Sequence, residues 1–285
     1  MNISGKTKVC AVIGDPVEHS LSPCIHNAAF QHLQLDYVYV AFSVKREELR
    51  TAIQGVRSLK IHGLNVTTPH KLDVIQHLDR LDESAKNVGA ANTILNKEGT
   101  LIGYNTDGKG ALLALEANQG NLLNKKILIL GAGGASRSIS YTLAQKAREL
   151  VVLNRTVERA ESLVKELLTP FGDKVRYGGL SRSRMKAELE DTDVLINATT
   201  LGMHPNEDET PVDQDLLRPN LTIFDLVYHP LETRLLREAK AAGARTIDGL
   251  AQLIYQGAVS FEIWTGKKAP IEVMMKAAQE KLKGG

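Results

Sequence analysis

Short apolar runs alternate with longer amphipathic segments along almost the whole chain of 285 residues. The apolar runs predict buried strands, and the segments between them predict helices, such as one with Leu49, Ile53 and Val56 on a single face. We expect strands at residues 8–14, 37–44, 63–67, 91–95, 100–105, 125–130, 150–154, 174–178, 193–197, 222–227 and 245–247. Regular alternation of this kind predicts an α/β fold with parallel sheets covered by helices.

Turn and cap signals add detail to this pattern. Ser22 and Pro23 predict an N-cap and a first helical proline for a helix that ends near Leu33. Residues 96–99 predict a hairpin turn between two strands. Two helices, at about residues 249–264 and 270–282, close the chain. A Gly-rich turn, a helix and a polar loop within residues 106–124 indicate the boundary between two domains.

Composition narrows the class of protein. Hydrophobic residues make up 43% of the chain and charged residues 24%, with a net charge of +2, which suits two modest domains. No basic run is interleaved with aromatic residues, so we expect no nucleic-acid partner. No apolar run approaches the ~18 residues of a membrane span, so we expect no membrane partner. The two cysteines, Cys10 and Cys24, fit no disulfide scaffold or zinc spacing, and we expect a cytoplasmic protein.

A glycine turn follows the strand predicted at residues 125–130 and opens a helix. Glycines allow a tight turn and let backbone N–H groups approach a pyrophosphate at the helix N-terminus. Ser136 stands at the third fingerprint position in place of glycine. The strand before the turn and the helix after it favour a dinucleotide site over a plain turn. The turn comprises Gly131, Ala132, Gly133, Gly134 and Ala135.

The end of the next strand indicates which dinucleotide binds. Asn154 stands where an NAD site usually places Asp or Glu, Arg155 follows it, and Arg159 comes one helical turn later. Two guanidinium groups are suited to clamp a 2′-phosphate through charge-assisted hydrogen bonds. We therefore predict NADP, the alternative being two arginines that simply face solvent.

Four polar clusters lie at or just after the ends of strands in the first part of the chain, at residues 19–22, 65–71, 89–93 and 105–110. Open α/β sheets bind ligands at such strand ends. Each cluster alone fits an ordinary cap or turn, but four of them favour a ligand site. Asn65 and Thr67 alternate with apolar residues and are expected to share one strand face, and Pro69 to direct the chain into a helix.

Taken together, these motifs resemble the shikimate dehydrogenase family. The resemblance rests on GDPVEHSLSPCIHNAAF, NVTTPHK, GAANT, NTDGKG, GAGGASR, NRT, NATTLGM, DLVYHP and DGLAQLIYQGA, which together span nearly the whole chain. It implies an NADP-dependent oxidoreductase that interconverts 3-dehydroshikimate and shikimate, on the pathway to chorismate and the aromatic amino acids. It also implies an N-terminal α/β substrate domain and a Rossmann-type, doubly wound NADP domain, with the active-site cleft between them.

The resemblance assigns functions to the two expected domains. A substrate-binding and catalytic domain is expected at residues 1–106, joined by the C-terminal helices at about 249–285. An NADP-binding domain is expected at residues 107–248. The oligomeric state stays open, with a homodimer as one candidate.

Site residues also follow from the resemblance. Lys71 and Asp107 match the catalytic pair, and Ser20 and Ser22 match the pair that binds the substrate carboxylate. Positions that bind ring hydroxyls or line the pocket match Asn65, Thr67, Asn92, Tyr228 and Gln256, together with Asp107. The NADP site matches Gly131 to Ala135, Asn154, Arg155, Thr156 and Arg159, and its nicotinamide half matches Thr199, Leu226 and Gly249.

The expected chemistry suits the catalytic pair. Hydride transfer to or from a secondary alcohol requires a general acid or base at the alcohol oxygen. Burial disfavours the ammonium form of a lysine such as Lys71, whereas a nearby Asp107 favours it. The sequence therefore leaves open whether Lys71 is the base or a cation that stabilises the alkoxide. The resemblance favours acid/base work shared by Lys71 and Asp107.

Two alternative functions stay open from the sequence. A dual-specificity quinate/shikimate dehydrogenase using NAD or NADP is the near alternative, although Ser22, rather than threonine, favours shikimate. A noncatalytic NADP-binding sensor is the alternative from another class, and the presence of both Lys71 and Asp107 argues against it. The histidines form no ligand set with nearby carboxylates, so we predict no metal; these are His19, His26, His70 and His229.

Overall fold

The computed structural model describes residues 3–283, apart from the side chain of Leu168, and the chain divides into two compact units. The first unit comprises Met1–Gly110 and Ile254–Gly285, and the second comprises Ala111–Leu253. The outermost residues of the predicted domains, 1–2 and 284–285, lie outside the described part. The functional division predicted after residues 106 and 248 stays a prediction, because compactness assigns no function.

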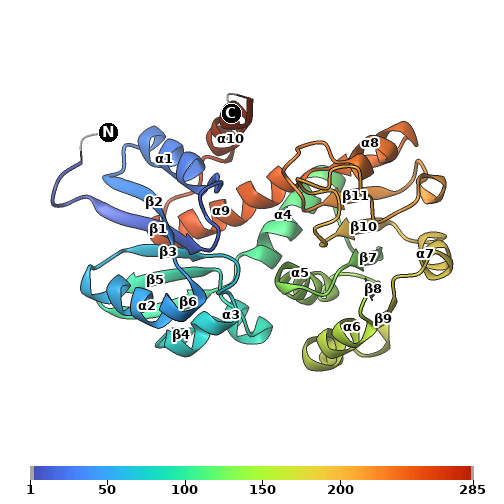
Figure 1. Cartoon of the computed structure of the whole chain (residues 1–285), viewed down its shortest axis with the longest axis horizontal. Coiled ribbons are helices and arrows are strands. Elements are labelled where there is room, and N and C mark those ends of the chain that lie inside the picture. Colours follow the sequence, from blue (N-terminus) through green and yellow to red (C-terminus); the bar gives the residue numbers. More distant parts are fainter. Residues whose placement is uncertain (1–2, 284–285) are drawn as a thin grey trace. The chain divides into compact units, whose positions relative to one another are not determined.

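The first unit contains a six-stranded sheet in the order β2-β1-β3-β5-β6-β4 (Figure 1). Strands β1, β2 and β3 run parallel, whereas β5 runs antiparallel to β3 and β6, so the predicted hairpin makes this sheet mixed. The expected strands are confirmed, but β4 has two residues and leaves no periodic signal. The bounds are β1 (Lys8–Gly14), β2 (Tyr37–Ser43), β3 (Gly63–Val66), β4 (Arg80–Leu81), β5 (Thr93–Lys97) and β6 (Thr100–Tyr104).

Helices cover this sheet. Helix α2 packs Leu49, Ile53 and Val56 into the core of the unit, which confirms the predicted apolar face. Helix α1 packs against α10 (Figure 1). The Trp264 indole of α9 donates a 2.9 Å hydrogen bond to the Ile94 carbonyl and anchors this helix to the sheet. The bounds are α1 (Ser22–His32), α2 (Leu49–Ser58), α3 (Glu83–Val88), α9 (Gly249–Thr265), α10 (Ile271–Lys283) and two 3₁₀ helices, Arg46–Glu48 and Asp73–His77.

The start of α1 differs from the prediction. Leu21, not Ser22, is the N-cap residue, and its backbone already has helical angles, so no side chain caps this helix. Ser22 is the first helical residue and is buried. The expectation that Ser22 is an N-cap was therefore wrong, and its hydroxyl has contacts elsewhere.

The second unit contains a six-stranded sheet in the order β12-β11-β10-β7-β8-β9, with every pairing parallel. If the strands are numbered 1 to 6 from β7 to β12 and the sheet is read from β9 to β12, the order is 3-2-1-4-5-6. This is the strand order of doubly wound dinucleotide-binding folds. The predicted α/β class and the parallel sheet are thus confirmed. The bounds are β7 (Lys126–Leu130), β8 (Glu149–Asn154), β9 (Val175–Gly179), β10 (Val194–Asn197), β11 (Thr222–Asp225) and β12 (Arg245–Ile247).

The core of the second unit is formed by apolar strand residues and the helices that cover them. Leu128, Leu130, Val151 and Leu153 pack with side chains of α7 and α8. No helix within residues 3–283 has the length and apolar character needed to cross a membrane. The helices are α4 (Asp107–Gln119), α5 (Gly134–Ala144), α6 (Val157–Leu163), α7 (Arg182–Leu189) and α8 (Arg234–Ala241), with a π-helical turn, Val164–Leu168, and 3₁₀ helices Thr169–Lys174 and Gln214–Leu216.

A buried charge cluster joins α7 to the second sheet. The Glu188 carboxylate lies 2.9 Å from Lys126 Nζ and 2.8 Å from both Arg176 Nη1 and Arg184 Nη2. Burial would raise the pKa of Glu188, but hydrogen bonds from Arg176 and Lys126 outweigh that effect and lower the pKa to about 2. Glu188 therefore stabilises the fold as a carboxylate.

A close approach of two helices shapes the first unit. Gly110 of α4 lies against the backbone of α9, where a Cβ atom would be 2.6 Å from Gln256 N and 2.8 Å from its Cα. Because backbone cannot move aside as a flexible side chain does, glycine is required at this crossing. Asp107, three residues earlier in α4, and Gln256 are thereby held in neighbouring turns of the two helices.

We predict that Glu188→Gln lowers the free energy of unfolding by about 3 kcal/mol at neutral pH, because the buried Lys126 and the partly exposed Arg176 and Arg184 lose a counter-charge. The wild-type stabilisation is present above the ordinary pKa of 4.5 and is lost as the pH falls through about 2. The difference between wild type and variant should therefore shrink in acid, as measured by urea unfolding from pH 7 to pH 3. The control is Glu190→Gln, an exposed neighbour; equal effects of the two variants would contradict the prediction.

We also predict that Gly110→Ala lowers the unfolding free energy by about 1–3 kcal/mol, because the added methyl group overlaps the α9 backbone. The matched control is Gly55→Ala inside α2, where an added Cβ would meet nothing within 4 Å. That change should raise stability by about 0.5–1 kcal/mol through helix propensity. Thermal unfolding of both variants checks the opposite signs, and a stabilised Gly110→Ala protein would refute the close approach.

Candidate active site

Lys71 lies in a turn that follows β3 and precedes the 3₁₀ helix Asp73–His77. The Ala91 N–H donates a 2.9 Å hydrogen bond to the Lys71 carbonyl and ties this turn to the segment before β5. The buried imidazole of His70 is 2.7 Å from the Val44 carbonyl oxygen and fixes the residue before Lys71. The helix expected after Pro69 is thus only a short 3₁₀ helix, and backbone and side-chain hydrogen bonds hold Lys71 in place.

Lys71 and Asp107 form an ion pair, with 2.6 Å between Lys71 Nζ and Asp107 Oδ2. Asp107 is the first residue of α4, where the helix dipole favours a carboxylate. The Lys71 side chain is 22% exposed and that of Asp107 is 8% exposed. The pair is therefore mostly buried, and Lys71 is the more exposed partner.

Asn92 fixes the other oxygen of the Asp107 carboxylate. Its Nδ2 lies 2.8 Å from Asp107 Oδ1, and its Oδ1 accepts a 2.8 Å hydrogen bond from the backbone N–H of Thr106. Because a backbone N–H can only donate, Asn92 Oδ1 must face Thr106 and Nδ2 must face Asp107. Gln256 Oε1 lies 3.4 Å from the same Nδ2. These contacts join Lys71, Asp107, Asn92 and Gln256 into one cluster.

The remaining predicted substrate residues differ in their contacts and burial. Asn65 is buried and donates from Nδ2 to the Asn92 carbonyl at 3.1 Å. Ser20 Oγ accepts the Ser22 N–H at 3.2 Å, so the two serines lie together. Thr67 follows β3 and is partly exposed. Tyr228 belongs to the second unit, where burial raises the pKa of its hydroxyl.

The glycine turn of the second unit has the geometry of an anion site. Gly131 has a φ of 104°, and a Cβ there would lie 2.8 Å from the Ala198 carbonyl oxygen, so only glycine fits. A Cβ on Gly133 or Gly134 would meet nothing within 4 Å, which leaves the start of α5 open to a ligand. The Ser136 hydroxyl donates to the Gly131 carbonyl at 2.6 Å, so this serine braces the turn. These residues fit a pyrophosphate.

The segment after β8 presents polar and basic groups to solvent. Asn154 Nδ2 donates to the Thr156 carbonyl at 2.8 Å and closes a turn, and Arg155, Thr156 and Arg159 are exposed. Glu158 lies beside Arg159 in the first turn of α6. Two guanidinium groups beside a tight turn fit a phosphate monoester.

The other predicted cofactor residues meet at the carboxyl ends of β10 and β11. Asn197 accepts hydrogen bonds from the Thr199 hydroxyl, at 2.6 Å on Oδ1, and from the Leu226 N–H, at 3.0 Å on its carbonyl. A Cβ on Gly249 would lie 2.5 Å from the Leu226 carbonyl oxygen. Sequence reasoning missed Asp225, a fully buried carboxylate that Asn197, Thr233 and the Val227 N–H all contact.

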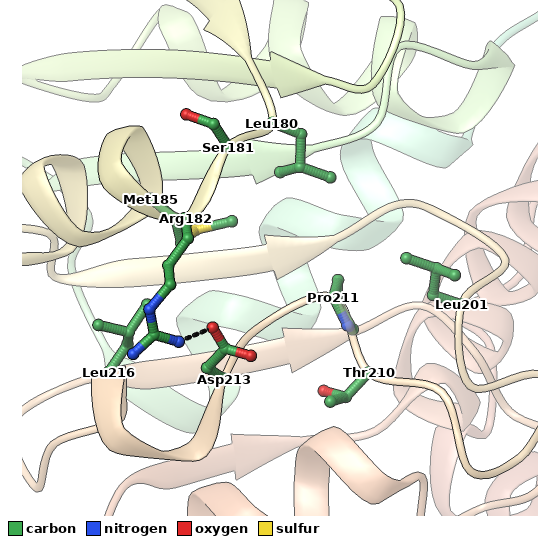
Figure 2. Close-up of a pocket in the computed structure, with 9 residues that line it drawn as sticks. All are labelled: Leu180, Ser181, Arg182, Met185, Leu201, Thr210, Pro211, Asp213 and Leu216. Carbon is green, nitrogen blue, oxygen red and sulfur yellow. Dashed lines mark hydrogen bonds and ion pairs between the residues drawn. The ribbon is translucent and has the colours of Figure 1, made fainter.

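A separate surface pocket, open to solvent, lies beside the end of β9 in the second unit (Figure 2). An ion pair between Arg182 and Asp213 closes one side of it. No predicted cofactor residue is among those that line it, which are Leu180, Ser181, Arg182, Met185, Leu201, Thr210, Pro211, Asp213 and Leu216. Within residues 3–283, no group of three or more His, Cys, Asp or Glu side chains is placed to hold a metal ion.

Three family models match successive parts of the chain. Residues 12–94 match the shikimate dehydrogenase substrate binding domain. Residues 113–226 match shikimate / quinate 5-dehydrogenase, and residues 249–279 match the shikimate 5′-dehydrogenase C-terminal domain.

Individual proteins match over nearly their full length. Shikimate dehydrogenase (NADP(+)) of Methanocaldococcus jannaschii is 49% identical, over 98% of this chain and 99% of its own. A crystal structure of a shikimate dehydrogenase in complex with NADP⁺ has a TM-score of 0.94 at 48% identity, covering 99% of this chain and 98% of its own. Shikimate 5-dehydrogenase from Listeria monocytogenes, in complex with shikimate and NAD, has a TM-score of 0.91 at 38% identity, covering 97% and 98%. This chain belongs to the shikimate dehydrogenase family.

Proposed function

We propose that this protein catalyses the reversible, NADP-linked reduction of 3-dehydroshikimate to shikimate, a step toward chorismate and the aromatic amino acids. The observation that carries the proposal is the Lys71–Asp107 pair, held by Asn92 in a member of this family. An ammonium group held by a fixed carboxylate is suited to exchange a proton with an alcohol oxygen.

Lys71 and Asp107 divide the proton chemistry between them in this proposal. Asp107 has one oxygen on Asn92 Nδ2 and the other on Lys71 Nζ, so its carboxylate cannot rotate without breaking a hydrogen bond. In the reduction direction the directed Lys71 ammonium group donates a proton to the substrate oxygen, and in the oxidation direction the neutral Lys71 amine accepts the hydroxyl proton. NADPH, when bound, would supply the hydride, and NADP⁺ would accept it.

The other predicted residues take binding roles. Ser20 and Ser22 bind the substrate carboxylate, and the ring hydroxyls are bound by Asn65, Thr67, Asn92, Asp107, Tyr228 and Gln256. A site of this polarity rejects analogues that lack a hydroxyl, because its own groups would then stay unpaired. The substrate domain is residues 1–106 with the C-terminal helices at about 249–285, and the NADP domain is residues 107–248.

The cofactor is assigned to the glycine turn and the segment after β8. The open side of Gly133 and Gly134, at the start of α5, supports pyrophosphate binding. The exposed Arg155 and Arg159, with Asn154 and Thr156, support binding of the 2′-phosphate. Thr199, Leu226 and Gly249 are assigned to the nicotinamide half.

The test is reduction of NADP by purified protein with shikimate and quinate side by side, repeated with NAD. Fast turnover with shikimate and NADP alone supports the proposal. Turnover with quinate or NAD would move the protein to the dual-specificity alternative, to which the NAD complex of the Listeria relative gives weight. No turnover, in folded protein that binds NADP, would favour the sensor.

We also propose a cytoplasmic location, which the two free thiols of Cys10 and Cys24 suit. Cell fractionation tests it, and recovery with the membranes or outside the cell would oppose it. A homodimer is proposed as the assembly, and light scattering at several concentrations distinguishes it from a monomer.

Lys71→Ala should lower kcat by roughly 10²-fold or more, as loss of a general acid/base does, while substrate affinity changes less. Steady-state kinetics and calorimetric binding of shikimate separate the two effects. The control is Lys86→Ala, which removes an exposed lysine of α3. Near-normal turnover of the Lys71 variant would remove this residue from the mechanism.

Arg155→Ala should weaken NADPH binding roughly 10-fold or more and leave NADH binding nearly unchanged, because only NADPH carries a phosphate for the guanidinium group. Fluorescence titration with both cofactors measures this. Arg148→Ala is the matched control, because Arg148 is an exposed arginine at the other end of β8. Equal losses for NADPH and NADH would mean that Arg155 does not contact the 2′-phosphate.

A further inference from the structure

The hydroxyl group of Tyr39 lies among the proposed substrate residues, although no sequence motif pointed to it. Tyr39 stands in the middle of β2 and is 2% exposed. Its hydroxyl is 2.6 Å from Asn65 Oδ1, within the normal range for a strong O–H···O hydrogen bond. A buried phenol is thus joined directly to a side chain assigned to the substrate ring.

The direction of this hydrogen bond is fixed by the backbone. Asn65 Nδ2 lies 3.1 Å from the Asn92 carbonyl oxygen, which can only accept. The amide nitrogen must therefore face Asn92, and the amide oxygen must face Tyr39. It follows that Tyr39 donates its single hydroxyl hydrogen to Asn65.

The other partners of the Asn65 amide do not choose its orientation. Its Nδ2 also lies 3.1 Å from the hydroxyl oxygens of Thr93 and Ser260. Hydroxyl groups donate or accept equally well, so they would satisfy either face of the amide. The Asn92 carbonyl selects the orientation, and the Tyr39 hydroxyl holds the amide oxygen in it.

Burial raises the pKa of Tyr39 well above its ordinary value, so the phenol keeps its hydrogen for the bond to Asn65.

An aromatic stack holds the Tyr39 ring in place. The His26 ring lies parallel to it, with centroids 4.5 Å apart and planes 11° apart, and Trp264 packs nearby at 5.9 Å. In the described part of the chain, neither nitrogen of His26 has a hydrogen-bond partner, and burial lowers the pKa of His26 to about 3. The neutral imidazole acts as an apolar plate that restrains the phenol.

We propose that Tyr39 is a positioning residue that holds the Asn65 amide in a single orientation toward the substrate. The inference rests on the proposed function and adds a residue to it. Without the Tyr39 donor, the buried Asn65 oxygen loses its hydrogen bond, and the amide is less firmly held. Tyr39 itself touches no reacting atom in this scheme and acts through Asn65.

The test is Tyr39→Phe, which removes one oxygen and keeps the ring stacked on His26. The matched control is Tyr37→Phe on the same strand, whose hydroxyl lies 3.3 Å from Lys8 Nζ and 3.5 Å from His62 Nε2. We expect kcat/KM for shikimate to fall roughly 10-fold or more in the Tyr39 variant and little in the control. The KM for NADP should change in neither.

A double-variant cycle with Asn65→Ala separates positioning from a general loss of stability. If Tyr39 acts mainly through Asn65, adding Tyr39→Phe to Asn65→Ala should lower kcat/KM by clearly less than it does in wild type. The proposal would be overturned if the losses in kcat/KM were fully additive in the double variant. It would also be overturned if Tyr39→Phe had the same kcat/KM as Tyr37→Phe, or if the Tyr39→Phe protein did not fold. Wild-type protein without turnover of shikimate would instead refute the proposed function, and it would be recognised because the Tyr37→Phe control would be equally inactive.

Discussion

The hydrogen bond from the Thr106 backbone N–H to Asn92 Oδ1 is the constraint on which the site of the first unit depends. It decides which face of the Asn92 amide meets Asp107, and Asp107 in turn holds the Lys71 ammonium group. These residues come from three separate segments: the turn after β3, the loop before β5 and the start of α4. A buried network of this kind holds its geometry because each polar group would be costly to leave unpaired.

Local patterns were sufficient to predict most of the fold. Apolar runs predicted the strands, and strand-end polar clusters contain Lys71 and Asp107, whose catalytic role was implied by the family resemblance and stays a prediction. The same patterns could not distinguish Tyr39 from Tyr37, because both are aromatic residues of one strand and point to the same face. The partner of Tyr39 lies 26 residues away, and Thr93 meets Ser260 across 167 residues, so the contacts exist only in the fold. Strand β4 and helix α3 were too short to leave a period.

The glycines of the two units differ in what occupies the space beside them, and the sequence alone does not show this difference. Gly110, Gly131 and Gly249 are each pressed against backbone atoms, whereas Gly133 and Gly134 border open space. The first group allows helices and strands to approach, and the second leaves room at the start of α5 for a ligand. A glycine in the sequence indicates that a side chain is absent, but only the surrounding structure tells whether protein or ligand uses the space.

The charged cluster of the second unit and the polar cluster of the first unit differ in the groups that surround their carboxylates. In the second unit, Glu188 sits among three cations and serves the fold. In the first unit, the described hydrogen-bond partners behind Lys71 and Asp107 are amides, hydroxyls and backbone groups, and the one phenol, Tyr39, has its pKa raised well above the ordinary value. Such groups fix geometry without taking up or releasing protons near neutral pH. Under the proposed function, proton exchange with a bound alcohol is therefore left to Lys71 and Asp107, the ion pair of this hydrogen-bonded cluster.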